Sequence, residues 1–297
     1  MLPNDRGILL LGGRDAGKTN FLARLWLALR RGEGDLGIPE TPQDIAYVER
    51  AVEHLLKGSF APRSRPEEEG PRDFRATVEV RRGEGAGTRA EILVPDTLGE
   101  LWSKAVATRE IEQEWYDAMK SCEGAALFVR TSSDQIRAPL DWVTSRELMG
   151  LLAAADDKRR EELPTQVLLC ELLKFLESTL RGPADGRRPR VAVVVTAWDL
   201  LDEERASSSP LACLEEEFPM FAGRIEDCSR LEVEVFGSSI VGGDLNDDQE
   251  FKRRYHKADT TKLGYIVVSP DGKHVEKRED VTLPIAWVLG VGGWKTR

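Results

Sequence analysis

The sequence predicts an α/β fold in three layers, with a mostly parallel central sheet and helices on both of its faces. Apolar runs at residues 7–11, 125–129 and 191–195 are uninterrupted, as is typical of parallel strands buried on both sides. Longer segments between these runs carry apolar residues at helical spacing. We also expect one antiparallel edge strand, helical insertions and a late β-hairpin.

The composition favours an acidic, intracellular protein. The 297 residues include 52 acidic and 42 basic side chains, a formal net charge of −10, so no broad positive surface for nucleic acid or anionic lipid is expected. Four well-separated cysteines without a C-x-x-C pair argue against a zinc site and a disulfide framework; they are Cys122, Cys170, Cys213 and Cys228. We find no membrane-spanning apolar stretch and no signal-peptide pattern, and therefore expect a cytoplasmic location.

The segment Gly12-Gly13-Arg14-Asp15-Ala16-Gly17-Lys18-Thr19 fits the phosphate-binding pattern G-x-x-x-x-G-K-[ST]. Its glycines allow the backbone to form a concave nest whose N–H groups point at an anion. Lys18 would reach the β- and γ-phosphates, and the Thr19 hydroxyl would complete the coordination of Mg²⁺. The helix expected at 20–31 directs its N-terminus at the phosphate. We expect nucleotide contacts throughout this loop and from Asn20.

A helix and a β-hairpin are expected next. Residues 41–44 (Thr-Pro-Gln-Asp) have the pattern of an N-cap followed by a proline that begins a helix, and Gly58 is placed to end that helix. This helical insertion covers about 38–58. Alternating apolar residues at 74–80 and 90–94, on either side of a glycine-rich turn, predict two paired strands.

The second of these strands runs into Pro-Asp-Thr-Leu-Gly-Glu at residues 95–100. An apolar strand that ends in Asp-x-x-Gly, downstream of a phosphate loop, provides an acid for Mg²⁺ and a glycine N–H for the γ-phosphate. Asp96 and Gly99 are the residues expected in these two roles. The same pattern is common in turns, so the functional interpretation depends on the phosphate loop.

The middle of the chain is predicted to be mainly helical. A helix is expected at 108–120, before the apolar strand at 125–129. The pattern between 139 and 181 indicates two helices, separated near Pro164, within an enlarged helical region of about 134–185. We interpret this region as plain packing in preference to a partner-binding surface.

Thr196-Ala197-Trp198-Asp199 follows the apolar strand at 191–195. Ligands of open α/β sheets bind at the carboxyl ends of parallel strands, so Asp199 is placed to accept hydrogen bonds from guanine N1 and N2. Adenine offers no such donors. The strand expected at 231–236 leads to Ser238 and Ser239, whose backbone we expect to close over the base. The remaining expected elements are a partly helical segment at 244–257, an extra hairpin at about 264–278 and a short helix at 283–289.

The order of these pieces resembles the translation-factor-related (TRAFAC) class of P-loop GTPases, in a Ras-like or Gα-like arrangement. The resemblance covers most of the chain and implies a P-loop NTPase fold, with residues 1–297 as a single elaborated G domain. The family's base-reading motif is Asn or Thr, then Lys, any residue and Asp. It is matched at Thr196 and Asp199, but Ala197 replaces the lysine whose stem packs on guanine, and Trp198 is a candidate substitute.

Around the phosphate loop and the late hairpin, the sequence looks more narrowly like the bacterial double-GTPase proteins associated with defence and conflict systems. The resemblance implies GTP or GDP and Mg²⁺ as ligands, Lys18 as a catalytic residue, and a switch that hydrolyses GTP slowly. Glu100 stands where the family has the Gln that orients the attacking water, and its charge beside a triphosphate is unfavourable. Arg14 replaces a glycine that admits an activating partner's arginine, so activation of that kind is disfavoured.

The family's first switch corresponds to residues 59–72, which contain no threonine. Ser64 is therefore the candidate metal ligand in this segment. Arg63 or Arg65 could supply a charge to the transition state, or the two could be a solvated surface pair. Because Gα-like proteins pair an acid at the position of Asp15 with their switch arginine, a contact from Asp15 to one of these arginines is expected.

Two other functions stay open at this point. A nucleotide-binding interaction module without useful catalysis would explain the absence of the switch threonine, the Gln and the motif lysine. An ATP-dependent phosphotransferase would need an acceptor site and a phosphate-clamping lid that the sequence does not identify. The expected partner is a protein effector or regulator, with a second GTPase as one candidate. Nucleic acid is not expected, and self-association is left open.

Overall fold

The computed structural model describes most of the chain, with several gaps. The described residues are 6–13, 15–32, 34–42, 45–62, 74–82, 85–94, 102, 105–106, 108, 110–111, 113–134, 136–137, 163–260 and 262–291. Within this part of the chain, none of the helices is both long and apolar enough to cross a lipid bilayer.

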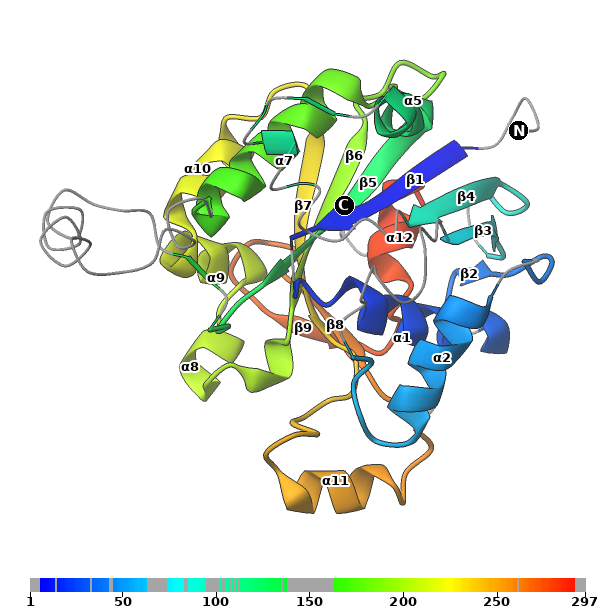
Figure 1. Cartoon of the computed structure of the whole chain (residues 1–297), viewed down its shortest axis with the longest axis vertical. Coiled ribbons are helices and arrows are strands. Elements are labelled where there is room, and N and C mark those ends of the chain that lie inside the picture. The colour runs from blue at the N-terminus through cyan, green and yellow to red at the C-terminus, as the bar shows by residue number, and fades with distance from the viewer. Residues whose placement is uncertain are drawn as a thin grey trace, which may run out of the picture.

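A single sheet of nine strands, in the order β2-β3-β4-β1-β5-β6-β7-β8-β9, forms the centre of the described structure (Figure 1). Five neighbouring strands, β4, β1, β5, β6 and β7, run parallel. The strands are β1 (Arg6–Gly12), β2 (Leu36–Gly37), β3 (Phe74–Val80), β4 (Arg89–Val94), β5 (Cys122–Arg130), β6 (Arg190–Thr196), β7 (Glu232–Ser239), β8 (Tyr265–Val268) and β9 (Glu276–Arg278).

The prediction of one antiparallel edge strand is wrong in its detail. Strand β3 runs antiparallel to β4, but β2 pairs with its other side, so β3 does not lie at the edge. A second antiparallel strand, β8, pairs with β7. The predicted late hairpin is confirmed as β8 and β9, and it extends the main sheet. Strand β2 has only two residues, too few for an alternating pattern to reveal in the sequence.

Helices cover both faces of the sheet, which confirms the predicted three layers. Helices α1 and α12 pack on one face, and α5, α7, α9 and α10 pack on the other (Figure 1). The helices are α1 (Lys18–Arg31), α2 (Ala46–Leu56), α5 (Gln113–Ser121), α7 (Thr165–Thr179), α8 (Glu203–Ala206), α9 (Pro210–Glu217), α10 (Pro219–Glu226), α11 (Gln249–Tyr255) and α12 (Leu283–Val288). The side chains of β6 alternate between the two cores, which explains why its sequence is apolar throughout.

Helix α2 begins later than the sequence predicts. Its first residue is Ala46, with Ile45 before it and no side-chain cap, whereas Thr41 and Pro42 lie in irregular backbone. Ile38 and Ile45 pack against the core under α1, so tertiary contacts take precedence over the local capping pattern. The predicted end is confirmed, because Gly58 adopts a φ of 69° and its N–H bonds the Leu55 carbonyl at 2.9 Å.

Several other boundaries differ from the predictions. Helix α5 begins at Gln113 and not near 108. Thr108 is itself helical and its hydroxyl accepts a hydrogen bond from the Glu110 N–H, but Glu110 and Ile111 lie in irregular backbone before α5. The second helix predicted between 139 and 181 is α7, and the first lies outside the described residues. Helices α8, α9 and α10 were not predicted, although Ser209 with Pro210 gives α9 a recognisable start.

A third, smaller core joins α1 to α2 and to the segment after β7. Its buried residues are Ala23, Ala51, Leu55, Val241, Leu245 and Tyr255. Arg24 of α1 is 1% exposed there, and its guanidinium donates to the carbonyls of Ile240 and Thr260, both at 2.6 Å. Burial lowers the pKa of Arg24, opposed by the Tyr255 hydroxyl. This buried side chain connects the helix that follows the phosphate loop to the C-terminal part of the chain.

Arg24→Ala is expected to lower the free energy of unfolding by about 2–4 kcal/mol, because it leaves two buried carbonyls without donors. Urea denaturation followed by circular dichroism measures the change. Arg30→Ala, on the exposed end of the same helix, should stay within about 0.5 kcal/mol of the wild type. Equal urea midpoints for the two variants would contradict a connecting role for Arg24.

Candidate nucleotide-binding site

The loop between β1 and α1 lies against the ends of β5 and β6. A Cβ atom at Gly12 would be 2.7 Å from the Phe128 carbonyl oxygen, and one at Gly17 would be 3.2 Å from the Thr196 hydroxyl. Gly17 also has a φ of 83°, which favours glycine, and it directly precedes the first turn of α1. The two glycines therefore allow the loop to approach the sheet closely and to turn into the helix.

Lys18 folds back over the loop. Its Nζ donates to the carbonyls of Gly12 at 2.8 Å and Gly13 at 3.3 Å. A cation is thus held over the loop backbone next to the N-terminus of α1, an arrangement suited to an anion. Arg14, which the sequence also places in this loop, lies outside the described residues.

The next two side chains connect α1 to its surroundings. The hydroxyl oxygens of Thr19 and Tyr47 are 2.8 Å apart, which joins α1 to the first turn of α2. The Asn20 amide oxygen accepts a hydrogen bond from the Ala61 N–H at 2.9 Å. Asn20 was predicted as a nucleotide contact, and the structure places its oxygen on the segment that enters residues 63–73.

The residues predicted to form the switches and the second metal ligand are not among those that the structure describes. Arg63, Ser64 and Arg65 fall in the gap at 63–73, and Asp96, Gly99 and Glu100 fall in the gap at 95–101. The second gap begins directly after Val94, where β4 ends beside β1. Nothing in the structure tests these six predictions.

Thr196 joins the phosphate loop to the end of β6. Thr196 is 6% exposed, and its hydroxyl oxygen lies 3.0 Å from the Ala16 carbonyl oxygen and 3.4 Å from that of Val129. The hydroxyl donates into the loop, so the Thr196 side chain supports the loop. The two predicted motifs are brought together by this contact.

Asp199 lies in a single 3₁₀ turn, Trp198–Leu200, directly after β6. Burial raises the pKa of its carboxyl group, against hydrogen bonds from the Ser239 hydroxyl and the Gly243 N–H. Burial together with the nearby charge of Asp199 raises the pKa of Tyr265 of β8 to about 12, and the Ser239 hydroxyl opposes this shift. Asp199, Ser239 and Tyr265 thus form one polar cluster at the carboxyl end of the sheet.

The prediction that Trp198 could replace the missing lysine is wrong. Trp198 is 1% exposed and packs in the core beneath β7, where a Cβ on Gly237 would be 2.5 Å from its ring. An indole buried in this way is not available to a ligand. Ser238, the other predicted base contact, is 1% exposed, and its hydroxyl has no hydrogen-bond partner among the described residues.

Residues other than glycine that adopt a positive φ gather at one edge of the sheet. In the described part of the chain they are Asp15 (φ 59°), Ser132 (φ 52°) and Ala197 (φ 59°). They follow the ends of β1, β5 and β6 within three residues. Such backbone conformations persist only where surrounding contacts hold them, and they concentrate at functional sites.

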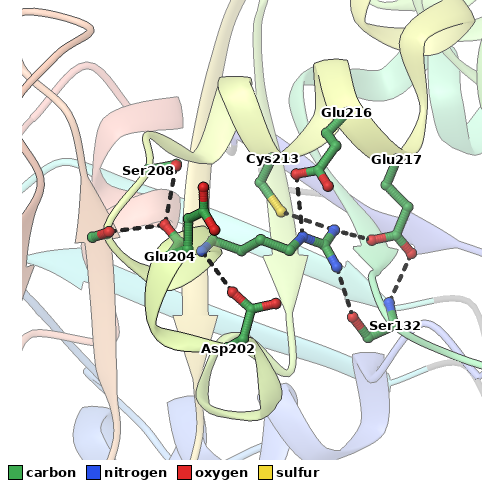
Figure 2. A network of polar contacts seen from close by, with 9 residues as sticks. Ser132, Asp202, Glu204, Ser208, Cys213, Glu216 and Glu217 are labelled. Carbon is green, nitrogen blue, oxygen red and sulfur yellow. Dashed lines mark hydrogen bonds and ion pairs between the residues drawn. The ribbon is translucent and has the colours of Figure 1, made fainter.

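Two groups of residues at this edge were not predicted to belong to the site. Arg130, the last residue of β5, donates from Nη1 to Asp15 Oδ2 at 3.2 Å. Beyond it, Glu217 accepts from the Ser132 N–H at 2.7 Å and pairs with Arg205, which also bonds the Ser132 hydroxyl (Figure 2). The apolar strand pattern ends at Val129. Nothing in the sequence indicates that the next residue, Arg130, contacts the phosphate loop.

Thr196→Val is expected to lower the free energy of unfolding by about 1–2 kcal/mol, because it removes the bond to Ala16 while keeping the shape of the side chain. Urea denaturation of the ligand-free protein measures this change. Ser238→Ala is the matched control, since Ser238 is the neighbour of Thr196 in register on β7 and its hydroxyl is unpaired in the described structure. If the two variants lose equal stability, the Thr196 bond does not support the loop.

Solved structures with a similar chain path have low sequence identity. A chain of the signal recognition particle receptor SRb-GTP/SRX complex from Chaetomium thermophilum is 14% identical, with a TM-score of 0.39, and the match covers 84% of this chain and 96% of that one. A probable GTP-binding protein, engB, is 12% identical, with a TM-score of 0.29 and coverages of 84% and 95%. Similarity at this level does not indicate the function of the chain.

No curated protein matches the chain. A family model, Double-GTPase 1, matches residues 9–288 and so includes the phosphate loop, the Asp199 turn and the late hairpin. The match confirms the resemblance to P-loop GTPases, including the narrower one to double-GTPase proteins. The chain belongs to the Double-GTPase 1 family of GTP-binding proteins.

Proposed function

We propose that this protein is a GTP-driven molecular switch that binds GTP or GDP with Mg²⁺ and hydrolyses GTP slowly to GDP and phosphate. The observation that carries the proposal is the bond from Thr196 to Ala16, which joins the phosphate loop to the strand that leads into Asp199. One ligand with phosphates at one end and a base at the other would engage both parts. We further propose residues 1–297 as one G domain located in the cytoplasm.

The phosphates would occupy the loop. There the Lys18 ammonium group would give up its hydrogen bonds to the Gly12 and Gly13 carbonyls and bind phosphate oxygens in their place. Thr19 fits a metal ligand, because its hydroxyl oxygen keeps at least one lone pair whichever way the hydrogen bond with Tyr47 runs. Mg²⁺ would neutralise charge on the β- and γ-phosphate oxygens. Asp96 and Ser64 are the further ligands that we propose. The backbone of the loop, with Arg14, Ala16 and the Gly99 N–H, would complete the phosphate contacts.

Asp199 would read the base. An ionised carboxylate accepts from both guanine N1–H and the N2 amino group, and adenine offers neither donor in that position. Ser239 and Gly243 lie close enough to this carboxyl to favour its ionised form, which is the form that would accept from a base. The backbone at Ser238 and Ser239 would lie beside the base.

For hydrolysis we propose that Glu100 orients the water that attacks the γ-phosphorus, with GDP as the leaving group. Arg63 or Arg65 would offset the charge that develops on the phosphate oxygens. A carboxylate beside a triphosphate is repelled by it, so the intrinsic rate should be low. A protein effector or regulator, such as a second GTPase, would then read the nucleotide state.

A nucleotide-binding interaction module without useful catalysis is the second candidate. The observation in its favour is that Ala197 offers only a methyl group where the family has lysine, while the neighbouring Trp198 is buried. Weakened base binding would suit a protein that uses bound nucleotide to support a protein–protein interaction and does not need to hydrolyse it. Hydrolysis, measured directly, separates the two candidates.

Single-turnover assays with GTP and with ATP should show slow cleavage of GTP that Glu100→Ala reduces by about tenfold or more, as expected for loss of a positioned water. Glu110→Ala, at an exposed position after β4, is the control. GDP affinity should not change in either variant. Binding without cleavage would favour the interaction module, and cleavage unchanged by Glu100→Ala would contradict the role of Glu100.

Asp199→Asn should weaken GTP binding by about 100-fold, since two charge-assisted hydrogen bonds are lost. The same variant should gain affinity for xanthosine triphosphate, because an amide can donate to the C2 carbonyl that xanthine carries in place of the amino group. Asp202→Asn is a matched control, as Asp202 caps α8 nearby and asparagine caps equally well. Equal losses for both nucleotides would show that Asp199 does not read the base.

A further inference from the structure

The base-side segment of this site contributes no cation of its own. Ala197 adopts a left-handed conformation, with φ 59° and ψ 34°, and its side chain ends at Cβ. Trp198, the next residue, is buried beneath β7. If a positive charge supports the phosphate loop from this edge of the sheet, it has to come from another strand.

Arg130 lies on the strand next to β6, at the position beside Thr196 and Ala197. It is the last residue of β5 and pairs in parallel register with Thr196, the residue before Ala197. Ala126 and Phe128, which share its strand face, belong to the core under α1, so Arg130 is on the same side of the sheet as the phosphate loop. The guanidinium therefore reaches the loop from the position beside the missing lysine.

The contact that Arg130 makes there is with an acidic residue inside the loop. Its Nη1 donates to Asp15 Oδ2 at 3.2 Å, and the two side chains are 33% and 24% exposed. Asp15 brings a negative charge into a loop suited to phosphate, and a like charge close to a ligand weakens its binding. Arg130 offsets that charge and also holds Asp15, whose φ is 59°.

The end of β5 is itself fixed to α8 and α9. Glu217 accepts from the Ser132 N–H at 2.7 Å, and Arg205 donates to the Ser132 hydroxyl at 3.2 Å (Figure 2). Arg205 and Glu217 form an ion pair with side chains that are 20% and 16% exposed. This network holds the backbone two residues after Arg130, which restricts where its guanidinium can lie.

We propose that Arg130 is a positioning residue for guanine-nucleotide binding, and that it supplies from β5 the positive charge that the Thr196–Asp199 segment lacks. It acts through Asp15: it neutralises the carboxylate beside the phosphates and fixes the loop in the conformation that receives them. The inference rests on the proposed nucleotide-binding function. It assigns a role to a residue outside the loop and outside the base-reading segment.

The test measures GDP and GTP affinity by equilibrium titration in Mg²⁺ for wild type, Arg130→Ala, Arg130→Lys and the double variant Arg130→Ala with Asp15→Ala. Arg130→Ala should weaken both nucleotides by about tenfold or more, corresponding to the loss of about 1.4 kcal/mol. Arg130→Lys should lose less, because it keeps the charge. The double variant should recover most of the affinity, since the Asp15 carboxylate whose charge Arg130 offsets is then gone as well.

Two further measurements separate this role from a structural one. The penalty of Arg130→Ala should shrink as ionic strength rises, because salt screens the repulsion between Asp15 and the phosphates. Urea denaturation checks that each variant is folded, and Arg188→Ala, in the exposed segment just before β6, serves as the control. Affinity within twofold of wild type for Arg130→Ala, or no recovery in the double variant, would overturn the inference. Wild type that binds neither GDP nor GTP would instead overturn the proposed function.

Discussion

Close contact between the phosphate loop and the ends of β5 and β6 is the constraint on which the candidate site depends. Gly12 leaves no room for a side chain on the sheet side and Gly17 leaves little, and the Thr196 hydroxyl binds the Ala16 carbonyl across the narrow gap. Because the loop is held against two strands, whatever follows those strands lies beside it. Asp15, Ser132 and Ala197, all with a positive φ, mark this edge. A ligand that bridges Ala16 and the Asp199 turn would meet two segments that are already joined through Thr196.

Charge at this edge is balanced over short distances, although the protein as a whole is acidic. Lys18 lies over the loop, Asp15 is paired with Arg130, and burial raises the pKa of the Asp199 carboxyl group. Hydrogen bonds from Ser239 and Gly243 favour the ionised form that a guanine base would require. The acidic net charge of the chain therefore does not predict the local charge of the site. A few neighbouring groups determine the electrostatic field there.

The sequence predicted those parts of the structure that have strong local patterns. Strands β1, β5 and β6 are buried on both faces, so their apolar runs are unambiguous, and Gly58 ends α2 as its conformation requires. The start of α2 was mispredicted because Ile38 and Ile45 pack across the core, a tertiary effect that a capping pattern does not contain. Arg130 and the burial of Trp198 were missed for the same reason: each depends on a neighbouring strand. Predictions at 63–73 and 95–101 fall outside the described residues.

We propose that the phosphate loop and the Asp199 turn form one site for a guanine nucleotide. Calorimetric titration of GDP, GTP and ATP into nucleotide-free protein, with Mg²⁺ present, tests it most directly, because the three ligands differ in base and in phosphate number. We expect one binding site per chain and an affinity for GDP and GTP at least about 100-fold higher than for ATP, since a site built around guanine's donors rejects a base that lacks them. ATP binding as tight as that of GTP, or tighter, would contradict the account.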